Sequence, residues 1–168
     1  SLIVYDKVSD VVKSLFKQGY VSFQDATSSS LQDYIKLDKG DKVLDLCAAP
    51  GGKSMHMAEK LEMGSITSCD IYEHKINLLK NEANRLGLDN INFQINDAMK
   101  LNKEFINKFD KVLLDVPCSG SGIISRKPEI KYQIDLKELK ELNDKQWKIL
   151  NISKEYVKKG GLLVYSTC

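Results

Sequence analysis

Residues 43–54 of the chain read VLDLCAAPGGKS, and this stretch decides the fold. Its first part, VLDLC, is a short apolar run interrupted by one acid, which is typical of a parallel strand buried on both faces. Pro50 suits the first turn of a helix, and Gly51 and Gly52 let a ligand approach the backbone closely. The stretch therefore predicts a strand, a turn and a helix whose first N–H groups point at an anionic ligand.

The ending Gly-Lys-Ser is shared with the P-loops of nucleotide triphosphate-binding proteins, but the spacing differs. A P-loop has a glycine five positions before its second glycine, and Cys47 stands at that position here. The predicted ligand is therefore a nucleoside-like molecule that carries an anion, which need not be a phosphate.

Strand and helix patterns alternate along the rest of the chain. This alternation predicts an α/β fold, a mostly parallel twisted sheet with helices on both faces and ligands at the carboxyl ends of its strands. Strands are expected at 43–47, 66–70, 91–95, 111–115 and 162–166, and helices at 53–61, 73–87 and 136–158, the last with Trp147 in the core. Less regular patterns predict a helix at 10–16, a strand at 20–23, a helix at 30–35 and a short helix or loop at 101–109.

Length and composition indicate one domain. The 168 residues are 42% hydrophobic and 29% charged, which fits a soluble globular protein. We expect residues 1–36 to form a lead-in and residues 37–168 the core. No apolar run reaches membrane-spanning length and the start is a poor signal peptide, so a cytoplasmic location is expected. The chain stops at Cys168 directly after a strand, and we therefore expect a fragment whose C-terminal strands are missing.

The four cysteines stand at positions 47, 69, 118 and 168, and no pair has C-x-x-C spacing. A zinc site or a redox dithiol is therefore not expected. Cys47 and Cys69 fit small buried hydrophobic residues. His56 and His74 lie in helical patterns and are expected at the surface or in packing, so no metal is predicted.

Acidic residues follow three of the predicted strands. Asp70 comes twenty-five residues after Asp45, near the offset at which dinucleotide-binding folds place an acid on the ribose hydroxyls. Asp97 follows the third strand and could accept from an adenine amino group, and Asp115 ends the fourth. Beside the glycine turn, these acids favour a ligand site over helix caps.

Three motifs, in this order and spacing, resemble those of the S-adenosylmethionine-dependent RNA cytosine-C5 methyltransferases, the Sun family. They are VLDLCAAPGGKS at 43–54, DVPCSGSG at 115–122 and LLVYSTC at 162–168. GYVSFQD at 19–25 and the helix and strand from Gln146 onward match as well, so the resemblance covers roughly residues 19–168. Residues 122–132 are most similar to the bacterial small-subunit ribosomal RNA methyltransferase B branch. The resemblance implies a Rossmann-like class I methyltransferase fold.

The resemblance implies S-adenosylmethionine as the cofactor, with its methionyl carboxylate at the glycine turn. Asp70 would hold the ribose, Asp97 would lie near the adenine, and Lys75 stands where the family usually has Arg, which has the planar fork that Lys lacks. The full implied cofactor set is Cys47, Ala48, Ala49, Pro50, Gly51, Gly52, Lys53, Asp70, Lys75, Asp97, Asp115 and Pro117.

The resemblance also assigns the chemistry. Cys168 would add to C6 of cytosine, which makes C5 reactive toward the methyl group. Asp115 would bind the N3/N4 edge of the base, where a carboxylic acid kept protonated in an apolar pocket could donate a hydrogen bond, and Lys53 would orient Asp115 or stabilise negative charge. Cys118, aimed by Pro117, would assist release of the methylated base.

RNA is the expected partner. Ten basic residues against six acidic ones from Ser119 onward give this part a mild positive charge that favours a polyanion. Arg126, Lys127 and Lys131 could contact phosphates, and Tyr132 could stack on an unpaired base. A solvated loop without RNA contacts would explain the same residues. The target cytosine must be single-stranded or flipped out of its stack.

Other functions remain compatible with parts of the pattern. A tRNA cytosine-C5 methyltransferase would carry the same motifs. A methyltransferase acting on small molecules or proteins would keep the first loop but would not need both cysteine motifs. A DNA cytosine methyltransferase would use Cys118 as the attacking thiol, and a silent RNA-binding module would have lost catalysis.

Overall fold

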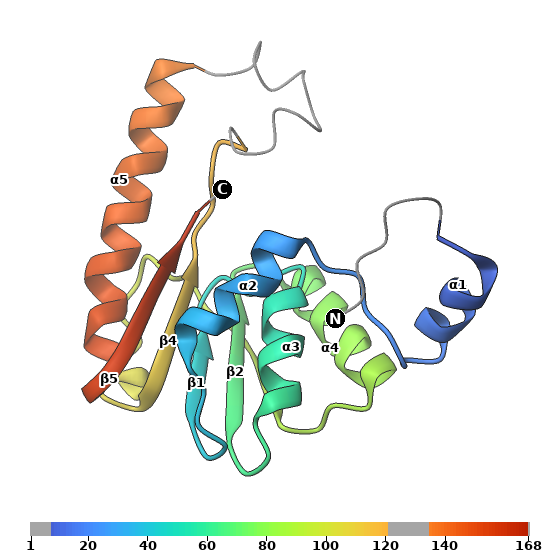
Figure 1. Ribbon diagram of the computed structural model, residues 1–168. Helices are drawn as coiled ribbons and strands as arrows, with labels where there is room; N and C mark the ends of the chain where they lie inside the picture. The colour runs from blue at the N-terminus through green and yellow to red at the C-terminus, as the bar shows by residue number, and fades with distance from the viewer. Residues whose placement is uncertain (1–7, 121–134, 168) are drawn as a thin grey trace.

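The computed structural model describes residues 8–120 and 135–167, apart from the side chains of residues 26, 27, 32 and 33. Its centre is a five-stranded sheet in which every neighbouring pair is parallel and the order is β3-β2-β1-β4-β5 (Figure 1). The strands are β1 (Lys42–Asp45), β2 (Ser65–Asp70), β3 (Ile91–Ile95), β4 (Phe109–Asp115) and β5 (Val157–Ser166). All five expected strands are present, which confirms the α/β class.

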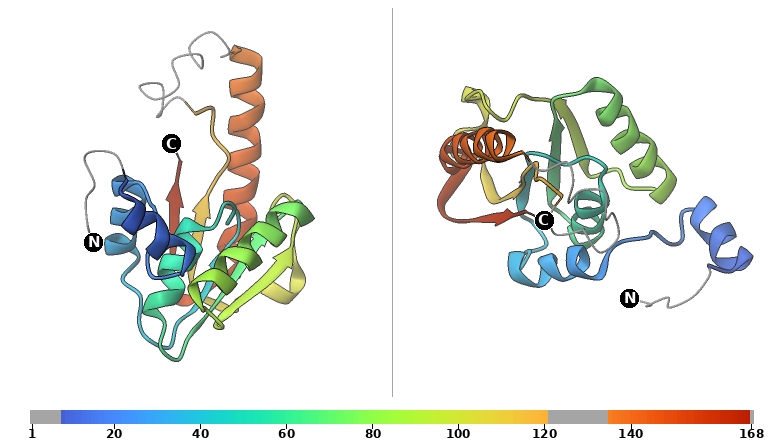
Figure 2. Two further views of the ribbon diagram at one scale, coloured as in Figure 1. Left: turned by 90° about the vertical axis from the view of Figure 1, so that its right-hand side faces the viewer. Right: turned by 90° about the horizontal axis from the view of Figure 1, so that it is seen from above.

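Helices cover both faces of the sheet (Figure 2). They are α1 (Asp10–Lys17), α2 (Ala26–Ile35), α3 (Gly52–Lys60), α4 (Glu73–Leu86) and α5 (Leu136–Ser153), with single 3₁₀ turns η1 (Lys103–Phe105) and η4 (Lys154–Tyr156). On one face Ile35 of α2, Met57 of α3 and Leu79 of α4 join a single buried cluster. On the other face Ile149 of α5 and Tyr156 join a second cluster. Each face of the sheet therefore has its own buried apolar cluster.

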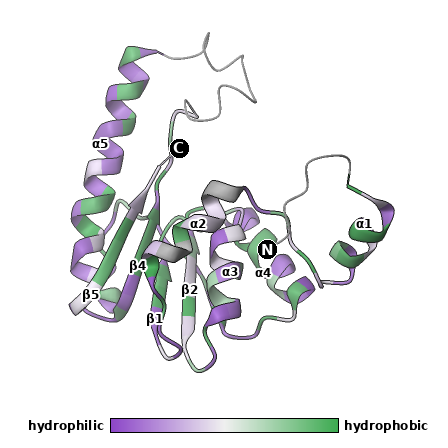
Figure 3. Ribbon diagram, viewed as in Figure 1, coloured by the Kyte–Doolittle hydropathy of each residue, from purple (hydrophilic) through white to green (hydrophobic). Residues whose placement is uncertain are grey.

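The burial of the strands explains why their sequences are nearly continuous apolar runs. The last three residues of β1 are fully buried, as are Val112, Leu113 and Leu114 of β4. Figure 3 shows the same contrast, with apolar strands at the centre and mixed polar and apolar helices around them. Parallel strands buried on both faces need this composition.

Most predicted helix bounds are close to the observed ones. Helix α4 ends where expected because Gly87 adopts the left-handed conformation (φ 68°) and donates its N–H to carbonyls of the last turn. Pro50, however, is not in a helical turn as predicted, because α3 begins only at Gly52. Helix α2 begins at Ala26 rather than Ser30, since the Ser29 N–H already bonds to the Asp25 carbonyl at 2.9 Å.

The predicted helix over residues 136–158 is too long. Helix α5 ends at Ser153, and the chain enters β5 at Val157. Tyr156 fixes this change: it is fully buried, its ring packs edge-on against Phe105 at 5.5 Å, and its hydroxyl accepts the Asn102 N–H at 2.9 Å. The Lys-Lys-Gly-Gly run at 158–161, interpreted as a helix end, lies in β5 next to a register irregularity.

Two further expectations are wrong. Residues 20–23 form no strand, and the Val21 carbonyl accepts from the Arg85 guanidinium of α4 at 3.1 Å. Trp147, expected in the core, is 65% exposed, because it lies on the side of α5 that faces away from Ile149. None of the helices in the described ranges combines the length and apolar character needed to cross a bilayer.

The strand order places a topological switch between β1 and β4. From β1 the chain moves outward through β2 to β3, and it then returns to the other side of β1 with β4 and β5. Ligands of such sheets bind at the carboxyl ends of the two strands flanking the switch. The loop after β1 and Asp115 at the end of β4 therefore lie where a ligand is expected.

Candidate functional site

A cavity of about 230 Å³ opens at the switch point between β1 and β4. Its walls come from the loop after β1, the start of α3, the end of β4 and the segment that leads into α2. The lining residues are Phe23, Gln24, Asp25, Ser28, Asp45, Cys47, Ala48, Pro50, Gly51, Gly52, Lys53 and Asp115. Seven residues of the predicted cofactor set thus line one cavity.

The glycine turn shapes this cavity as the sequence suggests, but the two glycines differ. Gly51 has φ 115°, and a β-carbon there would lie 2.7 Å from Cδ2 of Leu79. Only glycine fits that position. A β-carbon on Gly52 would meet only Gln24, at 3.8 Å or more. The backbone of Gly51 caps α3 without any side-chain hydrogen bond, which leaves the first N–H groups of the helix for a ligand.

Asp115 connects three elements at the mouth of the cavity. One of its carboxylate oxygens accepts from the Lys53 ammonium at 2.6 Å, and the other accepts from the Ser166 hydroxyl at 2.8 Å. The surroundings of Asp115 are therefore charged and polar, not the apolar pocket that was expected. The pairing fixes the carboxylate between α3 and β5.

Asp45 lies at the floor of the cavity and is 1% exposed. Its Oδ2 accepts from the Ser54 hydroxyl at 2.7 Å, and Ser54 in turn accepts from Ser68 at 2.9 Å. Its Oδ1 is buried with no hydrogen-bond partner among the described residues. Burial raises the pKa of Asp45 from 3.8 to about 7, and the nearby Asp115 adds to this while Ser54 and Lys53 oppose it.

The two free thiols beside the cavity are not reactive ones. Cys69 is completely buried, in agreement with the prediction, and burial raises its pKa well above the ordinary value. Cys47 is half-buried and lines the cavity, and burial with the nearby Asp45 and Asp70 raises its pKa to about 12. Both remain neutral thiols near pH 7.

Asp70 ends β2 beside this loop but does not line the cavity. It is 7% exposed, its Oδ1 accepts the Tyr72 N–H at 3.1 Å, and its Oδ2 lies 3.7 Å from the Lys75 ammonium. The Lys75 ammonium also lies 5.2 Å from the centre of the Tyr72 ring. Asp70 and Lys75, predicted separately, therefore form one ion pair at the strand end.

Asp97 is held by its own loop. Its Oδ1 accepts the Met99 N–H at 3.0 Å, and its Oδ2 lies 3.4 Å from the Lys100 ammonium. The neighbouring Asn96 N–H donates to the Asp70 carbonyl at 3.0 Å, which joins the loop to β2. Asp97 thus lies along the same sheet edge, beyond Asp70. Ala49, Asp70, Lys75, Asp97 and Pro117 are the predicted cofactor residues that do not line the cavity.

The register of β4 and β5 brings two sequence motifs together. Asp115 pairs with Ser166, and the Val116 N–H donates to the Ser166 carbonyl at 3.1 Å. Pro117 and the half-buried Cys118 follow directly, and the Pro117 carbonyl accepts from the Gln146 amide of α5 at 2.7 Å. The DVPC motif and the YST part of YSTC therefore lie side by side.

Several predicted residues lie outside the described part of the chain. They are the nucleophile candidate Cys168 and the RNA-contact candidates Arg126, Lys127, Lys131 and Tyr132. Within the described ranges, no three histidine, cysteine, aspartate or glutamate side chains group as they would around a metal ion.

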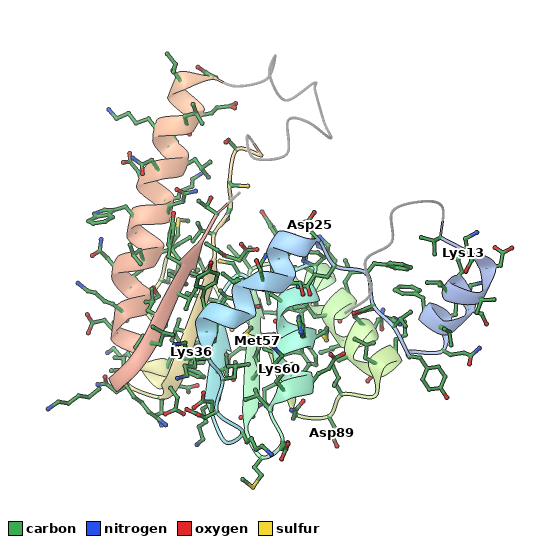
Figure 4. All side chains as sticks on the ribbon, in the orientation of Figure 1. Lys13, Asp25, Lys36, Met57, Lys60 and Asp89 are labelled. Atoms are coloured by element: carbon green, nitrogen blue, oxygen red, sulfur yellow. The ribbon has the colours of Figure 1, made fainter. Side chains whose placement is uncertain are left out.

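The sequence interpretation missed three groups at the site. The sequence pattern predicts Asp45 only as an acid within a buried strand, and it indicates no role for the Ser54 and Ser68 side chains. The segment containing Phe23, Gln24 and Asp25 is predicted to be part of a lead-in, but it forms one wall of the cavity. Figure 4 labels Asp25 at the start of α2, at the same end of the molecule as the carboxyl ends of the strands. The motif GYVSFQD was the available signal.

Comparison with known proteins adds the family context. A family model described as 16S rRNA methyltransferase RsmB/F matches residues 33–168. A probable ribosomal RNA small subunit methyltransferase B of Bacillus subtilis is 44% identical over 174 residues, covering 97% of this chain and 39% of that protein. The ribosomal RNA small subunit methyltransferase B of Klebsiella pneumoniae is 37% identical, covering 91% of this chain and 36% of that protein.

Solved structures agree with these sequence matches. NSun6 from Pyrococcus horikoshii, crystallised with SFG, superposes with a TM-score of 0.85 at 31% identity, over 97% of this chain and 41% of that one. A methyltransferase homologue from the same organism gives 0.81 at 30% identity, over 97% of this chain and 51% of that one. The chain thus spans about two fifths to one half of the proteins it resembles.

Proposed function

Because this chain belongs to the 16S rRNA methyltransferase RsmB/F family, we propose that it transfers a methyl group from S-adenosylmethionine to C5 of a cytosine in ribosomal RNA. Membership confirms the resemblance to the Sun family and the Rossmann-like class I methyltransferase fold. S-adenosylmethionine is the cofactor of methyltransferases with this fold. What the proposal adds is the reacting atom, the covalent route and the role of each residue.

The cavity residues fit the cofactor chemically. The uncapped start of α3 offers N–H groups to a carboxylate, and the unpartnered Oδ1 of Asp45 offers an acceptor to an ammonium group. Asp70, at the end of β2, is available to accept from ribose hydroxyls with Lys75 beside it, and Asp97 follows toward the adenine position. Ala48 and Gly51 give the methionyl part close access to the backbone.

Bound S-adenosylmethionine would supply the methyl group on a positively charged sulfur. C5 of cytosine does not attack such a group unaided, because the ring is aromatic and electron-poor. Addition of the Cys168 thiolate to C6 would remove the aromaticity and place electron density on C5. After transfer, a base removes the C5 proton, the C6–S bond breaks and the thiolate is regenerated.

The residues around Asp115 would control this sequence. Asp115 would bind the N3/N4 edge of the cytosine, and the Lys53 ammonium at 2.6 Å would hold its carboxylate in place. Cys118, three residues after Asp115, would assist the release step. Arg126, Lys127 and Lys131 would contact the RNA backbone. A ribosomal RNA substrate would place the protein in the cytoplasm.

One observation carries the proposal: the pairing of Asp115 with Ser166 at the rim of the cavity. Cys118 lies three residues after Asp115, and Cys168 comes two residues after Ser166 in the sequence. A methyltransferase of a small molecule would need no such meeting of two cysteine motifs. A tRNA cytosine would be modified by the same chemistry and is the main alternative substrate.

The two cysteines allow a direct test in the full-length protein. Cys168→Ala should abolish methylation of RNA and leave S-adenosylmethionine binding unchanged, whereas Cys118→Ala should let a covalent protein–RNA adduct accumulate on denaturing gels. The reverse pattern would indicate that Cys118 is the attacking thiol, as in DNA cytosine methyltransferases. Full activity of Cys168→Ala would overturn the proposal. A wild-type protein that binds RNA but neither binds S-adenosylmethionine nor methylates the RNA would overturn it as well.

A further inference from the structure

The segment before α2 is fastened to the core at a distance from the cavity. The Arg85 guanidinium in α4 donates to the carbonyls of Phe16 and Val21, and it lies 3.9 Å from the centre of the Phe16 ring. Gly19 packs so closely that a β-carbon there would lie 1.9 Å from the Arg85 carbonyl oxygen. These contacts determine where the chain passes on its way to α2.

Beyond this anchor the segment forms a wall of the cavity. Phe23, Gln24, Asp25 and Ser28 line it, opposite the loop after β1. A segment that served only as a connection would not need to place a polar side chain inside a ligand cavity. Among these residues, Gln24 has the most specific geometry for binding a ligand.

The amide of Gln24 is held in a defined orientation. Its Oε1 lies 3.1 Å from Nδ1 of His56, which points the amide nitrogen away from His56 when Nδ1 carries a proton. That nitrogen, Nε2, is buried and has no hydrogen-bond partner among the described residues. It lies 3.8 Å from where a β-carbon on Gly52 would stand, directly beside the first residue of α3.

The cavity thus contains two buried polar atoms of opposite character without partners. Gln24 Nε2 is a donor near the start of α3, and Asp45 Oδ1 is an acceptor at the floor. Buried polar groups are nearly always hydrogen-bonded, so both atoms point to a ligand that supplies the missing partners. A carboxylate beside an ammonium on one carbon provides that pair of groups.

We propose that Gln24 is a cofactor-binding residue that donates from Nε2 to the α-carboxylate of the methionyl part of S-adenosylmethionine. His56 is the positioning residue that sets the orientation of the amide. The inference rests on the proposed function, since it takes the cofactor from there. It makes the lead-in part of the binding site rather than a flanking segment.

Two ligands separate this role from a structural one. S-adenosylmethionine carries the amino-acid group, and 5′-methylthioadenosine lacks it. Gln24→Ala in the full-length protein should weaken S-adenosylmethionine binding by about 10- to 100-fold, as for loss of a hydrogen bond to a charged group, and leave 5′-methylthioadenosine binding within about twofold. Gln24→Glu, which places a negative charge against the carboxylate, should weaken S-adenosylmethionine binding further still. Gln18→Ala, on an exposed residue of the same segment, is the matched control.

Binding of 5′-methylthioadenosine by each variant shows that the protein is still folded, so a loss for S-adenosylmethionine alone cannot come from global misfolding. Equal losses for both ligands, no loss for either, or tighter S-adenosylmethionine binding by Gln24→Glu would each overturn the inference. A wild-type protein that binds neither ligand would instead overturn the proposed function, and this inference with it.

The His56 role has its own readout. His56→Ala should weaken S-adenosylmethionine binding by about 3- to 10-fold, and the double variant His56→Ala/Gln24→Ala should bind no more weakly than Gln24→Ala alone. Residues that act through one another are non-additive in this way. Simple addition of the two losses would show that His56 does not act through Gln24.

Discussion

The Lys53 ammonium lies 2.6 Å from a carboxylate oxygen of Asp115, although Lys53 belongs to α3 and Asp115 to the end of β4. The contact crosses the switch point of the sheet and joins the glycine turn to the loop that carries Cys118. Ser166 of β5 holds the other oxygen of Asp115 at 2.8 Å. The cofactor loop and both cysteine motifs are thereby connected through one carboxylate.

Removing the Lys53 charge should therefore impair catalysis more than cofactor binding. Lys53→Met keeps the length of the side chain but leaves Asp115 without its charged donor. We expect a loss of about 10- to 100-fold in the rate of RNA methylation at saturating S-adenosylmethionine, as for loss of a hydrogen bond to a charged group. Lys60→Met, on an exposed residue of the same helix, is the control. An unchanged rate for Lys53→Met would contradict the role given to this contact.

Asp45 should make stability fall as the pH rises. Its pKa is raised from 3.8 to about 7 by burial, so between these values the folded protein holds a proton that the unfolded chain releases. The Asp45 contribution is thus fully present below the unfolded pKa and lost as the pH rises through about 7, by at most about 1.4 kcal/mol per pH unit.

Asn has no such proton to lose. The free energy of unfolding of Asp45→Asn, relative to that of wild type, should therefore be higher at pH 8 than at pH 5. Urea unfolding of both proteins at the two pH values measures this difference. The same difference at both pH values would show that Asp45 is already ionised in the folded protein.

Gly51→Ala should disturb both stability and cofactor binding. The new methyl group would lie 2.7 Å from Cδ2 of Leu79 at a residue with φ 115°. We expect a loss of about 1–3 kcal/mol in the free energy of unfolding. Gly87→Ala is a matched control, because Gly87 has φ 68° but nothing within 4 Å of its added β-carbon, so it reports backbone strain alone. Equal losses from the two variants would argue against a packing role for the turn.

Arg85→Ala should release the segment that carries Gln24. The guanidinium holds the Phe16 and Val21 carbonyls, so its loss should expose this part of the chain to proteases and weaken S-adenosylmethionine binding several-fold. Limited proteolysis followed by mass spectrometry locates the cleavage sites. Lys80→Ala, on the exposed side of α4, should change neither property. If Arg85→Ala resisted proteolysis as wild type does, the anchor would not be needed.

The sequence was sufficient for the sheet because its strands are buried on both faces. Apolar runs such as VLDLC and KVLLD favour strands that are buried on both faces of a sheet. The helical patterns between these runs favour parallel pairing of the strands. The glycine turn and the acids at strand ends were found for the same reason: the carboxyl ends of parallel strands meet at one edge.

What the sequence did not reveal depends on tertiary contacts. The end of α5 is set by Tyr156 packing against Phe105, while the local Lys-Lys-Gly-Gly signal points several residues further. Asp45 reads as one acid in a strand, and only the fold shows that one of its oxygens is left unpartnered in the cavity. Gln24 lies in the motif GYVSFQD, but the motif does not show that its side chain lines the cavity, because the place of this segment depends on the distant Arg85.

The most direct test of the account is the identity of the methylated atom. The full-length protein is incubated with small-subunit ribosomal RNA and S-adenosylmethionine labelled in its methyl group, and the RNA is digested to nucleosides for mass spectrometry. We predict that the label appears in 5-methylcytidine and that Cys168→Ala removes it. Label in another nucleoside, or in 5-methylcytidine formed equally well by Cys168→Ala, would contradict the account.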